Sequence, residues 1–261
     1  MPVFFDQLNR EVNLPRSPKR IISTVPSQTE LLFYLGLDKY IIGITNFCTR
    51  PADKTKAVTK IGGTKKLDIK LIKELKPDLI IANKEENERE QIEELMAFCP
   101  VWISDVSDLP TAIDMIQSIG QMLNRKTKAD ALNKAIQYGF KQLHVPAKKL
   151  RVAYLIWRKP YMVAGKGTYI NSLLQTCGII NVFDVPRYPE ISADMLVAAQ
   201  PEVILLSSEP YPFSEKHVAE FSVLLPKAKI MLVDGEMFSW YGSRLLDVPG
   251  YLALLLSSLV H

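Results

Sequence analysis

Aromatic and charged side chains gather in a short stretch near the end of the chain. Glu236, Phe238, Trp240, Tyr241 and Arg244 all follow a predicted strand at 229–233. Large aromatic rings in a loop are difficult to explain by structure alone. Together with an acid and an arginine, they favour contact with a ligand. Packing of Trp240 and Tyr241 in a core is the alternative.

Similar residues follow other predicted strands. Loops that leave the same edge of a sheet meet in space, so their side chains can form one binding surface with aromatic faces and a few oriented polar groups. The candidates in the first half are Ser27, Gln28, Phe47, Arg50, Thr64 and Lys65, and those in the second half are Trp157, Arg158 and Tyr161.

Catalytic motifs are missing from the sequence. It contains no G-x-x-x-x-G-K-[ST], G-x-G-x-x-G, G-x-S-x-G or H-E-x-x-H pattern. Cys48, beside Phe47, is a possible nucleophile, but no histidine can be placed near it. We therefore predict no catalytic residues and a protein that is not an enzyme, with an α/β enzyme using the same loops as the alternative.

Metal ligands and disulfides are not indicated either. The three cysteines are far apart and odd in number, so at least one thiol stays free. His144, His217 and His261 lack a second ligand at metal spacing and are each predicted to lie on the surface. The 32 basic and 28 acidic residues give a mild net charge of +4 without basic runs, so nucleic acid is not an expected partner.

Strand and helix signals alternate along the chain, which is typical of a mostly parallel sheet covered by helices. A hairpin is expected around 7–9, a long irregular stretch at 46–66 and a loop at 158–167. Ser27 and Glu30 have the spacing of a capping box, with Gly36 at the helix end. The predicted strands are 20–25, 40–45, 78–82, 101–104, 151–157, 202–206 and 229–233. The predicted helices are 68–75, 85–98, 109–123, 168–177, 192–199, 214–223 and a last one from about 247.

One unit of this alternation is repeated. Residues 68–81 align without gaps on residues 192–205, and Pro77 meets Pro201 at an offset of 124. Because the offset is about half the chain, two lobes of similar topology are more plausible than a single domain.

A helix predicted at 127–143 lies between the two halves. Its apolar residues, spaced by three and four, form a narrow stripe on a lysine-rich rod about 25 Å long. We interpret it as a connector rather than one more surface helix. The expected domains are an N-terminal lobe at 1–123, a connecting helix at 124–146 and a C-terminal lobe at 147–261.

Four segments together resemble a known family. They are RIISTVPSQTELLFYLG at 20–36, the Gly62-Gly63-Thr64 turn, LKPDLI at 75–80 and GKGTYINSLLQTCG at 165–178. In their order and spacing the chain resembles the helical-backbone metal receptors, which are substrate-binding proteins of ABC importers for vitamin B12, ferric siderophores and haem. The vitamin B12-binding members are the most similar.

The resemblance implies two Rossmann-like lobes joined by one long helix, with a ligand cleft between the lobes and little hinge motion. It implies capture of a metal-containing chelate, first a corrinoid and second a ferric siderophore or haem, with no intrinsic cofactor and metal only inside the ligand. Phe47 would line the cleft and Glu236 would accept from the corrin. For an anionic siderophore, cations could come from Arg50, Arg158, Arg187 and Arg244.

Importers of this family dock through one acid on each lobe. The corresponding positions are Lys70 and Asp194, and Glu74 is the substitute for the lysine. A lysine would repel permease arginines. The expected partners are thus a small chelate and a permease, for a protein that is a monomer.

The resemblance places the protein in the periplasm or on a membrane anchor outside the cytoplasm. The N-terminal sequence shows no apolar segment of a secretion signal. A cytoplasmic ligand-binding or sensing module therefore remains an alternative.

Overall fold

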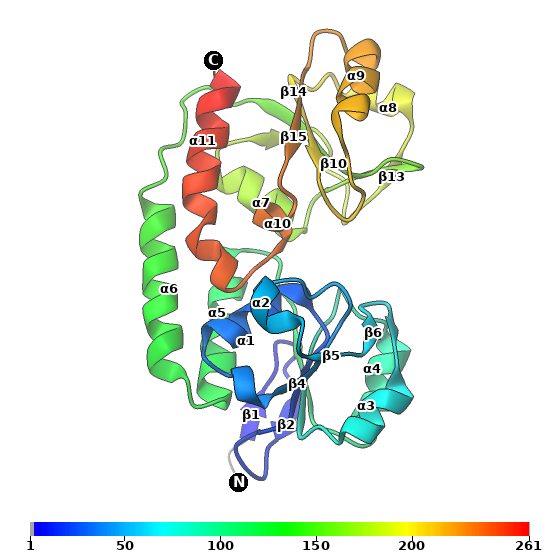
Figure 1. The fold of residues 1–261 in the computed structure, drawn as a ribbon. Helices are drawn as coiled ribbons and strands as arrows, with labels where there is room; N and C mark the ends of the chain where they lie inside the picture. Colours follow the sequence, from blue (N-terminus) through cyan, green and yellow to red (C-terminus); the bar gives the residue numbers. More distant parts are fainter. Residues whose placement is uncertain (1–2, 261) are drawn as a thin grey trace. The chain divides into compact units, whose positions relative to one another are not determined.

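In the computed structural model, which describes residues 3–260, strands and helices alternate as the sequence predicts (Figure 1). The chain forms two compact units, each made of three segments. The first unit contains the chain up to Val106, Pro110–Gln137 and Trp240–Leu246. The second contains Ser107–Leu109, Tyr138–Ser239 and the chain from Asp247 onward.

The first unit is built on a five-stranded parallel sheet. Its strands are β3 (Ile21–Ser23), β4 (Ile41–Ile44), β5 (Thr59–Lys60), β8 (Leu79–Asn83) and β9 (Val101–Ser104), in the order β5-β4-β3-β8-β9. The chain moves outward from β3 on one side and then restarts on the other. This order is that of a Rossmann-type sheet, whose switch point lies between β3 and β8.

Helices connect these strands and bury their apolar faces against the sheet. Ile22, Ile80 and Ala82 pack in one core cluster with Ile72 and Leu95 from the connecting helices. Because β3, β4, β8 and β9 are largely buried on both faces, they read as nearly continuous apolar runs, whereas the edge strand β5 is exposed. The connecting helices are α1 (Pro26–Tyr34), α3 (Ile69–Leu75) and α4 (Arg89–Met96), and α5 (Leu109–Met122) follows the last strand.

Two details of the first unit differ from the predictions. Ser27 and Glu30 form no capping box, because α1 begins earlier, at Pro26, and its N-cap Val25 has no side-chain oxygen. Gly36 does follow the helix in a left-handed conformation, with φ of 77°. The stretch 46–66 is not irregular throughout. It contains α2 (Ala52–Thr55), β5 and β6 (Gly62–Gly63), and β6 pairs with β7 (Lys66–Leu67).

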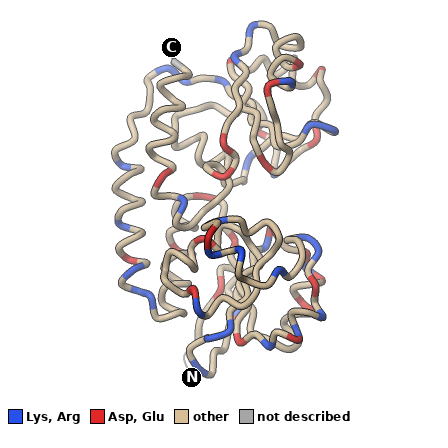
Figure 2. Tube along the Cα trace, viewed as in Figure 1, with Lys and Arg blue, Asp and Glu red and all other residues tan. Residues whose placement is uncertain are grey.

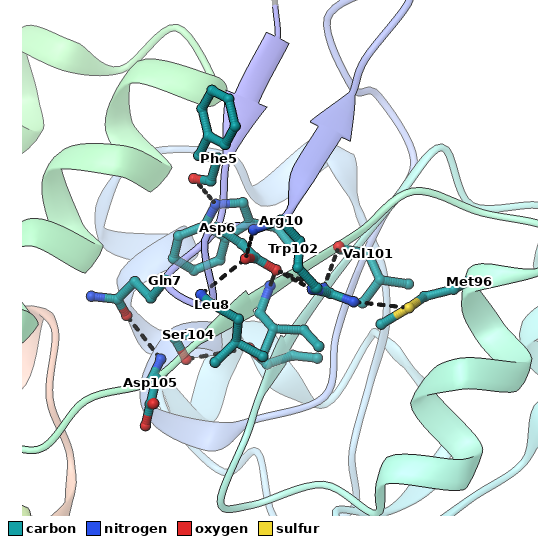
Figure 3. A network of polar contacts seen from close by, with 12 residues as sticks. Phe5, Asp6, Gln7, Leu8, Arg10, Met96, Val101, Trp102, Ser104 and Asp105 are labelled. Atoms are coloured by element: carbon teal, nitrogen blue, oxygen red, sulfur yellow. Dashed lines mark hydrogen bonds and ion pairs between the residues drawn. The ribbon is translucent and has the colours of Figure 1, made fainter.

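An N-terminal hairpin covers the outer edge of this sheet. Strands β1 (Val3–Phe5) and β2 (Glu11–Asn13) pair antiparallel, as predicted, and the Gln7 amide donates to the Ile103 carbonyl at 3.1 Å. Figure 3 shows the buried Asp6 carboxylate at the centre of the contact, where it accepts from the Leu8 amide, the Arg10 amide and guanidinium, and the Ile103 amide. The hairpin thereby blocks further pairing to β9.

The second unit has a mixed sheet. Strand β10 (Arg151–Trp157) is parallel to β12 (Ile180–Asn181) and β14 (Val203–Ser207), and β14 is parallel to β15 (Lys229–Val233). Three strands were not predicted: β12, β11 (Tyr161–Val163) and β13 (Glu190–Ile191). Strand β11 lies in the expected loop at 158–167 and pairs antiparallel with β10 and with β13. The helices are α7 (Tyr169–Thr176), α8 (Ala193–Ala198), α9 (Glu215–Leu224), α10 (Glu236–Ser239) and α11 (Val248–Val260).

The sequence repeat is visible in the caps of two helices. Asp68 caps α3 by accepting from the Leu71 amide, and Ser192 caps α8 by accepting from the Met195 amide. Lys76 and Gln200, again 124 positions apart, are both left-handed, with φ of 47° and 45°. Strands β8 and β14 then begin and end at matching positions.

A side-chain clasp at the amino end of the first sheet ties β3 to this repeated unit. Asp78 accepts from the amides of Lys19 and Arg20, and the Asp78 amide donates to the Arg20 carbonyl. The Arg20 guanidinium donates in turn to the Leu75 carbonyl at the end of α3. A cation at a helix C-terminus satisfies carbonyls that have no partner within the helix.

The second unit contains the same clasp. Glu202 accepts from the Arg151 amide at 3.0 Å, and the Arg151 guanidinium donates to the Ala199 carbonyl at 2.7 Å. Glu202 and Ala199 are each 124 positions beyond their counterparts. The two units therefore share a helix, its two caps, a buried strand and an arginine clasp.

Helix α6 (Lys126–Lys141) is continuous across the boundary between the units. Ala129, Leu132, Ile136 and Phe140 of the predicted stripe are buried, whereas Ala135 is exposed. Lysines occupy the exposed side, and elsewhere basic and acidic residues alternate along the chain (Figure 2). Within the described residues, none of the helices is both long and apolar enough to cross a membrane.

Removing the charge of Asp6 should destabilise the first unit. In D6N, an amide donor would face the Arg10 guanidinium and the Ile103 amide, so we expect a loss of about 2–3 kcal/mol of unfolding free energy. Urea denaturation followed by circular dichroism measures this loss. E11Q in the same hairpin keeps the Glu11 oxygen that accepts from Asn13 and should change stability by less than about 0.5 kcal/mol. Equal stabilities of the two variants would contradict the role given to Asp6.

Candidate functional site

The carboxyl ends of the parallel strands in the first unit converge on one edge, and a buried polar network fills the switch point there. The Thr24 hydroxyl donates to Asn87 Oδ1 at 2.8 Å, and the backbone amide of Asn83 donates to the same oxygen at 2.9 Å. Asn87 Nδ2 donates to the Thr64 carbonyl at 3.0 Å. The network thus fixes the loop that carries Thr64 against the ends of β3 and β8.

Ser27 and Gln28, two predicted ligand contacts, lie inside this edge. Both are buried, and Gln28 Nε2 donates to Ser104 Oγ, which also accepts from Asn83 Nδ2 at 2.9 Å. Among the described residues, Gln28 Oε1 has no hydrogen-bond partner. Their placement favours a structural role that joins α1 to the end of β9.

Phe47 is the most accessible aromatic side chain at this edge, with 61% of its surface exposed. It follows β4, and its ring rests on Gly63, where a Cβ would lie only 3.2 Å from Phe47 Cε2. Gly62 is also required, because it has φ of 96° and a Cβ there would lie 2.4 Å from the Lys66 carbonyl oxygen. The glycine pair therefore supports the exposed ring.

The three polar candidates near Phe47 differ in surroundings. Arg50 is exposed and Thr64 is half-buried. Lys65 is exposed, donates to the Glu85 carbonyl at 2.8 Å and forms an ion pair with Glu88 at 3.3 Å. All three lie on the loops that follow β4 and β6, as the sequence indicated.

Cys48 is not placed as a nucleophile. Its thiol is fully buried and contacts the hydroxyls of Thr29 and Thr45 at 3.1 and 3.2 Å. Burial raises the pKa of this thiol, and this effect exceeds the opposing effects of the two threonines and Lys60. All three cysteines are free and buried.

The aromatic stretch near the C-terminus is mostly interior. Trp240 and Tyr241 are 6% and 7% exposed, which matches the core-packing alternative. They begin the segment Trp240–Leu246, which belongs to the first unit and ends in the 3-10 turn η2 (Ser243–Leu246) against α1. Gly242 allows this contact, because it has φ of 122° and a Cβ there would lie 3.3 Å from the Ser27 carbonyl oxygen.

Arg244 fixes this segment to α1. Its guanidinium donates to both carboxylate oxygens of Glu30, at 2.7 and 3.2 Å, and lies 5.2 Å from the Trp240 ring centre. Both charged side chains are largely buried. A bidentate pair of this kind is both strong and directional, so the Arg244 charge is already matched by a carboxylate.

The remaining residues of that stretch belong to the second unit. Phe238 is fully buried and packs on Tyr154 and Tyr251, with ring centres 4.9 and 6.1 Å away. Glu236 is half-buried and begins α10. Helix α10 was not predicted, because four residues are too few for a periodic signal.

Trp157 is the exposed aromatic at the carboxyl end of β10, with 38% of its surface accessible. Its ring meets the Tyr211 ring edge-on, with centres 5.6 Å apart. Arg158 and Tyr161 both donate to Glu220 on α9, at 2.6 and 3.0 Å. Burial acts to raise the pKa of Glu220, but the bonds from Arg158 and Tyr161 outweigh it and the pKa is lowered.

His217 is buried, although the sequence predicts it on the surface. It is 2% exposed, and its Nδ1 accepts from the Ser214 amide at 2.9 Å while its Nε2 contacts the Tyr211 hydroxyl at 3.1 Å. The spacing Ser214-x-x-His217 is that of a capping box with histidine in place of the usual Glu or Gln. That spacing is the sequence feature from which the position of His217 at the start of a helix could have been predicted. His144 is exposed as predicted, and His261 lies outside the described residues.

The proposed docking residues are all on helix surfaces. Lys70 and Asp194 are exposed at the second position of α3 and of α8, and Glu74 is exposed one turn after Lys70. The two positions are thus equivalent within the repeated unit. They differ in the sign of their charge.

Residues 3–260 contain no group of three or more His, Cys, Asp or Glu side chains placed to hold a metal ion. A surface depression lies at the amino end of β9, lined by the hairpin and residues 96–101. It contains none of the predicted ligand-binding residues.

Comparison with known proteins agrees with this fold. A family model described as periplasmic binding protein matches residues 21–221. A vitamin B12-binding protein of Pectobacterium carotovorum is 24% identical over 237 residues, which cover 88% of this chain and 85% of the relative.

Solved structures are similar over almost the whole chain. The periplasmic vitamin B12 binding protein of Vibrio cholerae has a TM-score of 0.81 at 21% identity, covering 94% of this chain and 99% of its own. The molybdate periplasmic binding protein of Haemophilus influenzae has a TM-score of 0.83 at 18% identity, covering 100% and 91%. At these identities the likeness shows the fold, and the bound molecules named for the two structures differ.

The placement of Cys48 predicts a thiol without reactivity in the folded protein. Because the thiol is buried and its pKa is raised, a fluorescent maleimide at pH 7.5 should label Cys48 at least about a hundredfold more slowly than after denaturation in guanidinium. Peptide mass spectrometry measures labelling at each cysteine, and Cys99 and Cys177 serve as internal buried controls. Rapid, selective labelling of Cys48 would instead favour the enzyme alternative.

Proposed function

This chain belongs to the periplasmic binding protein family, and from that premise we propose that it is the substrate-binding protein of an ABC-type importer for a metal-containing chelate. We propose a corrinoid as the ligand. The proposal is supported by the relative from Pectobacterium carotovorum, whose name states vitamin B12 binding.

The observation that carries the corrinoid proposal is the placement of two exposed aromatic rings. Phe47 follows β4 and Trp157 is the last residue of β10, so each lies at the carboxyl edge of its own sheet; they are 61% and 38% exposed. Each ring packs against a neighbouring residue, Phe47 against Gly63 and Trp157 against Tyr211. A large, flat and partly apolar ligand gains most from such supported rings.

The charged candidates favour a corrinoid over an anionic siderophore. Arg158 and Arg244 are paired with Glu220 and Glu30, so their charges are matched by carboxylates before any ligand binds. A multiply charged ligand would have to compete for them at considerable cost. A ferric siderophore or haem remains the second candidate, with Arg50 and Arg187 exposed.

In this proposal Thr64, Lys65, Tyr161 and Glu236 supply polar contacts around the rings. Any metal enters inside the chelate rather than as a resident cofactor, and no catalytic residue is assigned. The protein acts outside the cytoplasm as a monomer. A ligand-sensing module in the cytoplasm, using the same fold, is the alternative. It would bind the chelate without a permease.

Binding of cyanocobalamin tests the proposal directly. Isothermal titration calorimetry should show one site with micromolar affinity or tighter, and F47A and W157A should each weaken it about tenfold or more through lost ring contact. F98A is the matched control, because Phe98 is also an exposed phenylalanine of the first unit but lies at the end of α4. If wild-type protein binds haem or a ferric siderophore but not cyanocobalamin, the corrinoid proposal is wrong.

Docking on a permease would depend on charge at the equivalent helix positions. We propose that Asp194 and Glu74 contact permease arginines and that Lys70 weakens the contact. D194K should therefore reduce stimulation of the importer's ATPase activity, while K70E should raise it severalfold with a steeper salt dependence. E90Q on the exposed face of α4 is a control that should leave stimulation unchanged. A lower stimulation with K70E, or an unchanged or higher stimulation with D194K, would count against this surface.

A further inference from the structure

The neighbours of Trp157 form a connected set that ends at a buried histidine. Tyr211 packs edge-on against the Trp157 ring and also donates its amide to the Ile156 carbonyl, at 3.4 Å. The Tyr211 hydroxyl contacts His217 Nε2 at 3.1 Å. A chain of three side chains therefore links the exposed ring to the first turn of α9.

The hydrogen bonds of His217 define its protonation state. Because Nδ1 accepts from the Ser214 amide, the neutral ring carries its proton on Nε2 and donates it to the Tyr211 oxygen. The ring is enclosed by Tyr211 and Phe213, whose centres lie 5.4 and 5.3 Å from it. A second proton on Nδ1 would remove the acceptor for the Ser214 backbone amide and place a positive charge on a side chain that is only 2% exposed.

The charges around His217 also favour the neutral ring. Burial, followed by the positive charges of Lys216 and Arg158, lowers the pKa of His217 from its ordinary value of 6.5, and Glu220 acts in the opposite direction. A histidine with a lowered pKa in the folded state stabilises the fold fully above pH 6.5. That contribution is lost as the pH falls through the lower, folded-state value.

We propose that His217 and Tyr211 are positioning residues that hold the Trp157 ring in place for the ligand only while His217 is neutral. Protonation of His217 breaks its bond from Ser214, displaces the Tyr211 ring and releases Trp157, so that the chelate is bound at neutral pH and held less tightly in acid. This inference rests on the proposed function for its ligand. The coupling between His217 and Trp157 does not rest on the proposed function.

The coupling is measured without ligand by acrylamide quenching of tryptophan fluorescence. The chain has three tryptophans, and Trp102 and Trp240 are buried, so the signal of Trp157 is the difference between wild-type protein and W157F. Between pH 7.5 and pH 5.0 we expect a step in quenching with a midpoint below 6.5. H217Q should abolish the step, because a glutamine amide at the third helix position accepts from Ser214 at any pH.

Two further variants make this test specific. H144Q removes the exposed histidine and should keep the wild-type step. Y211F keeps the ring but loses the hydroxyl, so Trp157 should be more accessible already at pH 7.5 and the step should shrink. A step that persists in H217Q, or no step in wild-type protein, would overturn the proposal.

Cyanocobalamin binding then separates the two proposals. We expect its Kd to rise about tenfold from pH 7.5 to pH 5.0 in wild-type and H144Q protein and to stay constant in H217Q. Absence of binding at every pH, with the fluorescence step intact, overturns the corrinoid proposal and supports the positioning role. Binding with the same pH dependence in H217Q overturns the positioning role alone.

Discussion

Everything in this fold depends on the direction of its strands. Parallel strands all end at the same edge of a sheet, and each must leave that edge through a loop before a helix can return the chain. In the first unit, β8 and β9 end in Asn83 and Ser104, and Thr24 and Thr45 directly follow β3 and β4; all four residues are buried and polar. Their hydrogen bonds leave little freedom to the loops above, and the exposed Phe47 ring stands on this rigid base.

The two units of the chain contain the same set of anchoring contacts. In both units an arginine binds the carbonyl at the end of a helix and its backbone amide binds a carboxylate just before the next strand; these carbonyls and carboxylates lie 124 positions apart. The surfaces of the two units have diverged further than these anchors. Lys70 and Asp194 are equivalent in position and opposite in charge, while the caps beneath them perform the same task.

The sequence predicted well those features that depend on nearby residues. Strands β9, β10 and β15 match their predicted limits at every residue, because each is an apolar run between turn signals. Strand β11 was missed because it has only three residues, too few for an alternating pattern, although its partner β10 directly precedes it in the sequence. The burial of Trp240 and Tyr241 could not be predicted from the sequence either, because the contact that holds this segment joins Arg244 to Glu30, 214 positions away. Which of several aromatics stay exposed is decided by such contacts.

That contact also has a consequence for the order of synthesis. The first unit includes Trp240–Leu246, which is made after almost the whole second unit. A growing chain can assemble the first sheet early, but the groove beside α1 stays unfilled until residue 246 has left the ribosome. Completion of the amino-terminal half therefore waits until most of the second unit has been synthesised, and a chain truncated before Trp240 would expose apolar surface on α1 to chaperones and proteases.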